Sequence, residues 1–258
     1  MDNKKLTIDE ILERMRFEEL VALGQAPCPQ CNRISPPGCL VCSPLRTYWR
    51  YWKQVAPRFK DAAVHLLKPQ EDLADLFNMD RQRDAIALVK VNPSGSYYLA
   101  GMFGAGKTHF LHALYRQALY ATAAQHEHLS TMPVWLCSAP ELVEAASARK
   151  SDPSLAFPRI TPELVEKVSR QSMRPCLFLD ELDKFSPTES RMSFLGSLID
   201  SVYSANGQIV AAANMAPIDL VEKWDRAVPY YADSIIRRFA FAPSGTTITF
   251  TPEPKEVQ

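Results

Sequence analysis

Residues 100–110 read AGMFGAGKTHF, and this short stretch holds three of the nine glycines in the 258-residue chain. Residues 101–108 fit the pattern GxxxxGK[ST], in which glycines let consecutive backbone N–H groups wrap closely around an anion. In such a loop Lys107 reaches the β and γ phosphates of a nucleotide, and the Thr108 hydroxyl ligates Mg²⁺. A tight structural turn is the alternative. We predict a nucleotide-binding loop made of Gly101, Gly104, Ala105, Gly106, Lys107, Thr108 and His109.

A strand is predicted over 175–181, and its apolar residues end at two acids, Asp180 and Glu181. Asp180 suits the contact with Mg²⁺, and Glu181 suits polarising an attacking water. The alternative is that the acids only mark where the strand meets solvent. Asn214 ends another predicted strand, 208–214, and its amide could hold the same water, although asparagine also ends strands for turn-forming reasons.

From residue 96 on, the chain alternates between predicted strands and predicted helices. Apolar runs predict further strands at 96–101, 132–138 and 246–250, and amphipathic segments predict helices at 107–124, 140–149, 162–171, 188–205, 217–224 and 230–239. One or two more helices are expected between residues 70 and 91. This alternation is typical of an α/β fold, in which helices cover both faces of a parallel sheet.

Four of the six cysteines lie between residues 28 and 42, in two CxxC turns. Two such turns supply the four thiolates of a tetrahedral zinc site, which leaves no open position for catalysis. Incidental core cysteines and a redox pair are the alternatives. We predict a structural Zn²⁺ site held by Cys28, Cys31, Cys39 and Cys42.

Two segments flank these cysteines. Residues 7–22 begin with a capping box, Thr7 and Glu10, and have the apolar spacing of a short amphipathic helix. The segment RTYWRYWKQVAPRF, 46–59, interleaves bases with aromatic rings. Such a mixture can contact single-stranded nucleic acid. The aromatic residues can equally form a buried seam between the cysteine-rich segment and the main domain.

Composition excludes some classes of protein. Hydrophobic residues make up 47% and charged residues 22% of the chain, which is ordinary for a globular protein rather than a disordered one. The formal net charge is +0, so any attraction to nucleic acid must be local. We find neither a signal peptide nor an apolar run long enough to cross a membrane, and we therefore expect a cytoplasmic protein without a membrane partner.

The motifs taken together resemble those of the AAA+ ATPases. Residues 101–108 correspond to Walker A, 176–181 to Walker B, Asn214 to sensor 1, and Arg238 to an arginine finger, with Arg237 as the neighbouring candidate. Both arginines could instead be a solvated helix face. Within the superfamily the chain looks most like the DnaC/IstB branch of helicase loaders and transposition helpers. GKTHFLHAL, LFLDEL, AANMAP and RRF carry this resemblance, which covers residues 55–250.

Two features depart from the family pattern. Loaders often have two aspartates at the end of Walker B, whereas this chain has Asp180 and Glu181, so hydrolysis should be competent. The residues after Arg238 are too few for the helical lid of most relatives, so no C-terminal lid domain is expected. The predicted organisation is an N-terminal helix at 1–24, a zinc knuckle at 25–45, a basic and aromatic linker at 46–70, and an AAA+ domain at 71–258.

The resemblance implies a Mg²⁺-dependent ATPase that forms a homo-oligomer in the ATP state and grips single-stranded DNA. Its implied task is loading a replicative helicase, which the N-terminal segments would hold. Arg149, Lys150 and Arg159 occupy the position of the family's DNA-gripping element. The alternatives are a transposition helper that recruits a transposase, a small-molecule P-loop kinase, and a zinc-dependent adaptor with an inert nucleotide site.

Overall fold

A computed structural model of the chain describes residues 48, 51–52, 54–69, 79–125, 131–151, 160–241 and 245–250. The chain divides into two compact units. The smaller comprises Met1–Asp61 and Arg116–Met132, and the larger comprises Ala62–Tyr115 and Pro133–Gln258. The predicted helix at 7–22, the four clustered cysteines and Arg159 lie outside the described residues.

The larger unit contains a parallel five-stranded sheet in the order β2-β3-β4-β1-β5. Its strands are β1 (Tyr97–Gly101), β2 (Val134–Ser138), β3 (Cys176–Asp180), β4 (Gln208–Ala213) and β5 (Thr246–Phe250). β1, β3 and β4 are buried along nearly their whole length because both faces of the sheet are covered. The α/β prediction and all five predicted strands are confirmed, with ends that shift by one or two residues.

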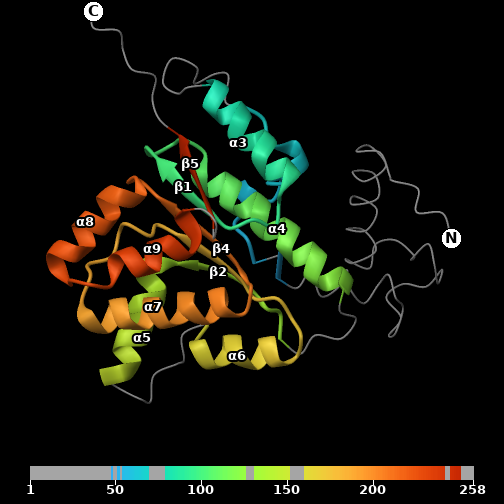
Figure 1. Cartoon of the computed structure of the whole chain (residues 1–258). Helices are drawn as coiled ribbons and strands as arrows, with labels where there is room; N and C mark the ends of the chain where they lie inside the picture. Colours follow the sequence, from blue (N-terminus) through green and yellow to red (C-terminus); the bar gives the residue numbers. More distant parts are fainter. Residues whose placement is uncertain are drawn as a thin grey trace, which may run out of the picture. The chain divides into compact units, whose positions relative to one another are not determined.

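Helices connect the strands and form layers on the two faces (Figure 1). The helices of the larger unit are α3 (Met79–Val91), the first half of α4 (Lys107–Gln125), α5 (Ala139–Ser151), α6 (Pro162–Arg170), α7 (Glu189–Ser204), α8 (Pro217–Ala227) and α9 (Ala232–Ala240). The 3₁₀ turn η2 (Val64–Leu66) belongs to the same unit, and η1 (Pro57–Phe59) belongs to the smaller one. Within the described residues no helix combines the length and apolar character that a membrane crossing requires.

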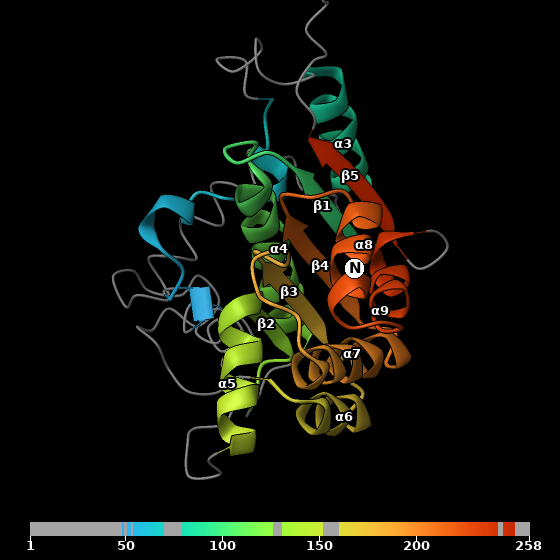
Figure 2. The same cartoon turned by 90° about the vertical axis from the view of Figure 1, so that its left-hand side faces the viewer.

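Aromatic contacts identify which helices cover which face. Tyr115 of α4 packs edge-on against Phe178 of β3, with ring centroids 5.6 Å apart. Tyr98 of β1 stacks on Phe239 of α9 at 6.1 Å. The strand register places Phe178 and Tyr98 on opposite faces, since Tyr97 and Phe178 both align with Val210 and successive side chains alternate. The first half of α4 and α9 therefore cover opposite faces, as Figure 2 shows.

Local signals explain where several helices begin. Thr161 precedes Pro162 at the start of α6, and its hydroxyl accepts the Leu164 N–H at 3.3 Å. Thr188 caps α7 in the same way. The helix predicted from residue 230 begins instead at Ala232, because Tyr230 has a φ of 78°, in the left-handed region that a right-handed helix cannot include.

Two aromatic residues of the segment 46–59, Tyr48 and Trp52, pack inside the smaller unit. Trp52 is fully buried, and Arg116 of α4 lies over its ring at 5.2 Å. The same guanidinium donates from Nε to the Tyr48 hydroxyl at 2.8 Å. Tyr48 is also buried, so these two rings serve packing rather than offering open faces to nucleic-acid bases. Trp49 lies outside the described residues.

Substitutions at Gly101 and Gly104 test how closely the end of β1 approaches β5. Gly101 has a φ of 151°, and an added Cβ would lie 2.3 Å from the Phe250 carbonyl oxygen. Gly104 also has a positive φ, 81°, but an added Cβ would meet no atom within 4 Å. We expect Gly101→Ala to lower the free energy of unfolding by roughly 2–4 kcal/mol and Gly104→Ala by about 1 kcal/mol. Chemical denaturation followed by circular dichroism measures both, and equal losses would contradict the described strand contact.

Candidate nucleotide-binding site

The predicted nucleotide-site residues meet at the carboxyl edge of the sheet. The phosphate loop follows β1, Asp180 ends β3 with Glu181 directly after it, and Asn214 follows β4. Because β4 lies between β1 and β3, Asn214 stands between the loop and the two acids. Ligands of open parallel sheets bind at this edge, where the connecting loops diverge.

The loop between β1 and α4 has the backbone of an anion cradle. Its three glycines have positive φ values, 151° at Gly101, 81° at Gly104 and 87° at Gly106. α4 begins directly after them at Lys107, with Thr108 and His109 in its first turn. The N–H groups of a helix's first turn have no partners within the helix, and together with the helix dipole they attract phosphate.

Lys107 is a buried cation within this loop. Its side chain is largely covered, and Nζ donates to the carbonyl oxygens of Gly101 at 2.8 Å and Met102 at 2.7 Å and to Oδ1 of Asn214 at 3.1 Å. Burial lowers the pKa of the ammonium, while Asp183 and Asp180 oppose that effect. The ammonium group therefore lies where phosphate oxygens could replace the carbonyl acceptors.

Thr108 and Asp180 form the pair that could hold a magnesium ion. Burial raises the pKa of the Asp180 carboxyl, and a hydrogen bond from the Thr108 hydroxyl partly opposes this. Oδ1 of Asp180 also accepts the Glu181 N–H at 2.9 Å. A hydroxyl and a carboxylate side by side supply the hard oxygen ligands that Mg²⁺ binds together with phosphate oxygens, so these residues fit the ion.

Glu181 has a strained backbone beside this pair. Its φ is 58°, in the left-handed region, which costs a non-glycine residue about 1–2 kcal/mol. The carboxylate is partly exposed and pairs with the Lys184 ammonium at 2.5 Å. This pairing raises the pKa of Lys184. The ion pair occupies Oε1 of Glu181 and stabilises the charged carboxylate, which makes it a weaker base toward a water than it would be without the ammonium.

Sequence reasoning missed Asp183. Its carboxylate is buried, with Oδ1 accepting the Asn214 backbone N–H at 3.0 Å and Oδ2 accepting the Asn214 side-chain amide at 3.2 Å. Only its place, three residues after Asp180 in LFLDELDKF, could have indicated it. Nothing in the sequence pairs an acid in this segment with an asparagine 31 residues later.

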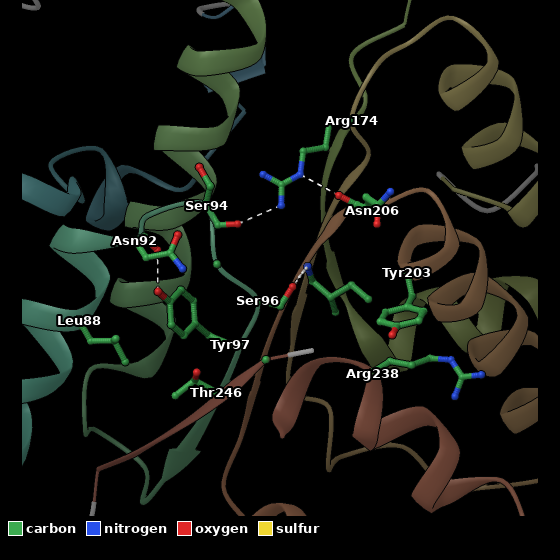
Figure 3. Close-up of a pocket in the computed structure, with 14 residues that line it drawn as sticks. Leu88, Asn92, Ser94, Ser96, Tyr97, Arg174, Tyr203, Asn206, Arg238 and Thr246 are labelled. Atoms are coloured by element: carbon green, nitrogen blue, oxygen red, sulfur yellow. Dashed lines mark hydrogen bonds between the residues drawn. The ribbon is translucent and has the colours of Figure 1, made fainter. Parts of the chain in front are cut away.

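The two candidate finger arginines lie away from this site. Arg238 lines a cavity of ≈ 550 Å³ at the amino edge of the sheet, together with Arg174, Tyr203 and Asn206 (Figure 3). It forms an ion pair with Asp200 and lies over the Tyr203 ring at 5.9 Å. Arg237 is exposed and pairs with Asp233 at 2.6 Å. β1 runs from this edge to the phosphate loop, roughly 15 Å at about 3.3 Å per residue, so Arg238 does not join the nucleotide site of its own chain.

The structure describes only some of the other predicted site residues. Arg149 and Lys150 lie in the last turn of α5, which leaves the carboxyl end of β2. The zinc ligands Cys28, Cys31, Cys39 and Cys42 are not among the described residues. Within the part of the chain that the structure describes, no group of three or more histidine, cysteine or acidic residues could hold a metal. DNA contact and zinc binding therefore stay predictions.

Comparisons with known proteins identify the fold. No protein-family model matches the chain, and no curated protein does. Among solved structures, the crystal structure of the DnaC helicase loader is similar over 76% of this chain and 100% of its own, with a TM-score of 0.52 and 14% identity. AMPPCP-bound DnaA from Aquifex aeolicus and DnaA bound to AMPPCP and single-stranded DNA each match 76% of this chain, with TM-scores of 0.50 and 17% identity. The chain spans about half the length of those DnaA chains. It has the fold of a P-loop AAA+ domain of this type.

The raised pKa of Asp180 predicts how nucleotide binding depends on pH. A carboxyl whose pKa lies above its ordinary 3.8 takes up a proton earlier on acidification, and the proton then competes with Mg²⁺. We expect the magnesium-dependent part of ATP affinity to fall as the pH is lowered from neutral toward this pKa. Titration with a fluorescent ATP analogue across pH measures it.

Asp180→Asn is the control for this pH effect. It should lose the magnesium-dependent affinity at every pH. Its melting temperature should be kept or raised, because the amide removes a buried carboxyl that resists ionisation. A magnesium-dependent affinity in Asp180→Asn that equals the wild-type value would contradict the assignment of Asp180.

Proposed function

We propose that this chain is a magnesium-dependent ATPase that acts on DNA, and specifically a DnaC-like loader of a replicative helicase. The observation that carries the proposal is the meeting of Lys107, Asp180 and Asn214 at one sheet edge, beside a glycine loop that opens a helix. The similarity to DnaC, which extends over the whole of that chain, supports the helicase as partner.

The chain's own residues suggest how ATP would be bound. The backbone N–H groups from Gly104 to Thr108 would surround the phosphates, and Lys107 would exchange its carbonyl acceptors for phosphate oxygens. Thr108 and Asp180 would hold Mg²⁺, which supplies charge neutralisation at the β and γ phosphates when bound.

Hydrolysis would then use the two polar residues on either side of the phosphates. Glu181, released from Lys184, would accept the proton of the attacking water. Asn214 would hold that water by a hydrogen bond.

The proposal includes a homo-oligomer in the ATP state, because Arg238 could act as an arginine finger only between copies. The guanidinium lies at the edge opposite its own phosphate loop, so it could serve only the site of a neighbouring copy. A head-to-tail arrangement of identical chains brings the amino edge of one copy to the carboxyl edge of the next. There Arg238 would stabilise the charge that develops on the transferred phosphoryl group.

The partners belong to the same proposal. The segment 7–22 and a zinc site of Cys28, Cys31, Cys39 and Cys42 would hold the helicase, and the end of α5 would contact single-stranded DNA. A cytoplasmic location is part of this proposal. No observation favours the transposition helper, the small-molecule kinase or the adaptor with an inert nucleotide site, so these remain outcomes of the test.

ATP turnover by the full chain tests the proposal. We expect magnesium-dependent hydrolysis that both single-stranded DNA and a replicative helicase stimulate. Glu181→Gln should keep ATP affinity and lose turnover about 100-fold or more, because it removes the base, whereas Lys107→Ala should lose binding.

Four results would contradict the proposal. Absence of wild-type turnover would do so, as would wild-type turnover in Glu181→Gln. Stimulation by a transposase instead of a helicase, or phosphoryl transfer to a small acceptor, would identify one of the alternatives.

Mixing two inactive variants tests whether Arg238 acts in a neighbouring copy. Arg238→Ala and Lys107→Ala should each lose turnover, by about 10³-fold or more for the arginine. Their mixture should regain part of the activity, because some mixed interfaces join an intact phosphate loop to an intact Arg238.

Arg237→Ala is the matched control, since Arg237 also pairs with an acid but lies on the exposed side of α9. It should stay near wild type. Wild-type turnover by Arg238→Ala, or no recovery in a mixture that demonstrably exchanges subunits, would refute an action between copies.

A further inference from the structure

The side chain of Asn214 lies between two charged groups of opposite sign. On one side Asp183 Oδ2 accepts from Nδ2 of Asn214 at 3.2 Å, and on the other Lys107 Nζ donates to Oδ1 at 3.1 Å. Both charged groups are buried, with 8% of each residue exposed. Water therefore does little to weaken either hydrogen bond.

The chemistry of these two neighbours allows only one orientation of the amide. A carboxylate can only accept hydrogen bonds and an ammonium can only donate them. If the amide were turned over, its NH₂ would face the Lys107 ammonium and its oxygen would face the Asp183 carboxylate. That would leave two donors opposed and two acceptors opposed at buried positions, where unmade hydrogen bonds are costly.

Asp183 is itself fixed to the strand that carries Asn214. The backbone N–H of Leu182 donates to the Ala212 carbonyl oxygen in β4 at 2.9 Å. The carbonyl oxygen of Asp183 accepts from Lys223 of α8 at 2.5 Å. Oδ1 of Asp183 holds the Asn214 backbone N–H, so one carboxylate fixes both the backbone and the side chain of Asn214.

We infer that Asp183 is a positioning residue that locks Asn214 with its carbonyl oxygen toward the phosphate loop, so that Asn214 serves the nucleotide site as a hydrogen-bond acceptor. This inference rests on the proposed function. An amide oxygen has two lone pairs, so the Oδ1 of Asn214 can accept a hydrogen bond from the site while it also accepts one from Lys107. An acceptor there binds an O–H of the attacking water, whereas a donor would bind a phosphate oxygen. Asn214 and Glu181 would then hold the same water from two sides.

An exchange of the two side chains tests this orientation. Asp183→Asn leaves one oxygen for the two N–H groups of Asn214, so its own NH₂ opposes either the backbone N–H or the side-chain NH₂, and the Asn214 amide is no longer held in one orientation. Asn214→Asp places two carboxylates together. The double exchange, Asp183→Asn with Asn214→Asp, restores one donor and one acceptor between the positions and again presents an oxygen to Lys107.

Turnover and ATP affinity are measured for all four proteins. We expect each single variant to lower kcat by roughly 10- to 100-fold with ATP Kd changed less than about threefold. The double exchange should recover kcat to within about tenfold of wild type. A kcat equal to wild type in Asp183→Asn would overturn the inference, as would a double exchange no better than the worse single variant.

Melting temperatures of the same four proteins give a readout that does not depend on activity. Each single change should lower the melting temperature by roughly 2–8 °C, and the double exchange should lower it by less than the sum of the two. Absence of wild-type ATP turnover alongside this coupling would reject the proposed function and keep the orientation of Asn214. Additive losses would reject the orientation whatever the turnover.

Discussion

The buried ammonium of Lys107 is the interaction on which the nucleotide site depends. A cation in this position needs several acceptors, and the carboxyl edge of the sheet supplies them from two strands: backbone carbonyls after β1 and the Asn214 amide after β4. The carboxylates of Asp180 and Asp183 favour its charge against the cost of burial. The strand order β3-β4-β1 makes this possible, because it places Asn214 between the phosphate loop and the acids. The order of the strands therefore determines which charged and polar groups surround Lys107.

The sequence predicts those elements of the site that depend only on residues close together in the chain. The five strands follow from apolar runs with turn residues at their ends, and the phosphate loop from three glycines ahead of Lys107 and a helix. Helix limits are less accurate where a single backbone angle decides them, as at Tyr230. For the basic segment, sequence left two interpretations open. The burial of Tyr48 and Trp52 against Arg116 depends on α4, since Arg116 lies 68 residues after Tyr48, and no local pattern contains such a pairing.

Pairings between distant residues could not be predicted for the same reason. The hydrogen bonds from Asn214 to Asp183 join segments from two different strands, and only the folded sheet brings them together. The ion pair of Glu181 with Lys184 is local, yet it depends on the left-handed backbone at a glutamate, which sequence does not indicate. The amino edge, with Arg238 and the cavity beside it, is likewise assembled from β1, α7, α9 and β5. Site residues that follow single strands could be named in advance, whereas the groups that orient them could not.

The most direct measurement is a crystal structure of the full chain with Mg²⁺ and a non-hydrolysable ATP analogue. We predict the triphosphate against the N–H groups of residues 104–108, Mg²⁺ between Thr108 and Asp180, and Lys107 Nζ turned from the Met102 carbonyl to a phosphate oxygen. A nucleotide bound elsewhere, or a triphosphate at this loop with Asp180 and Thr108 apart from the metal, would contradict the assignment of this edge as the catalytic site.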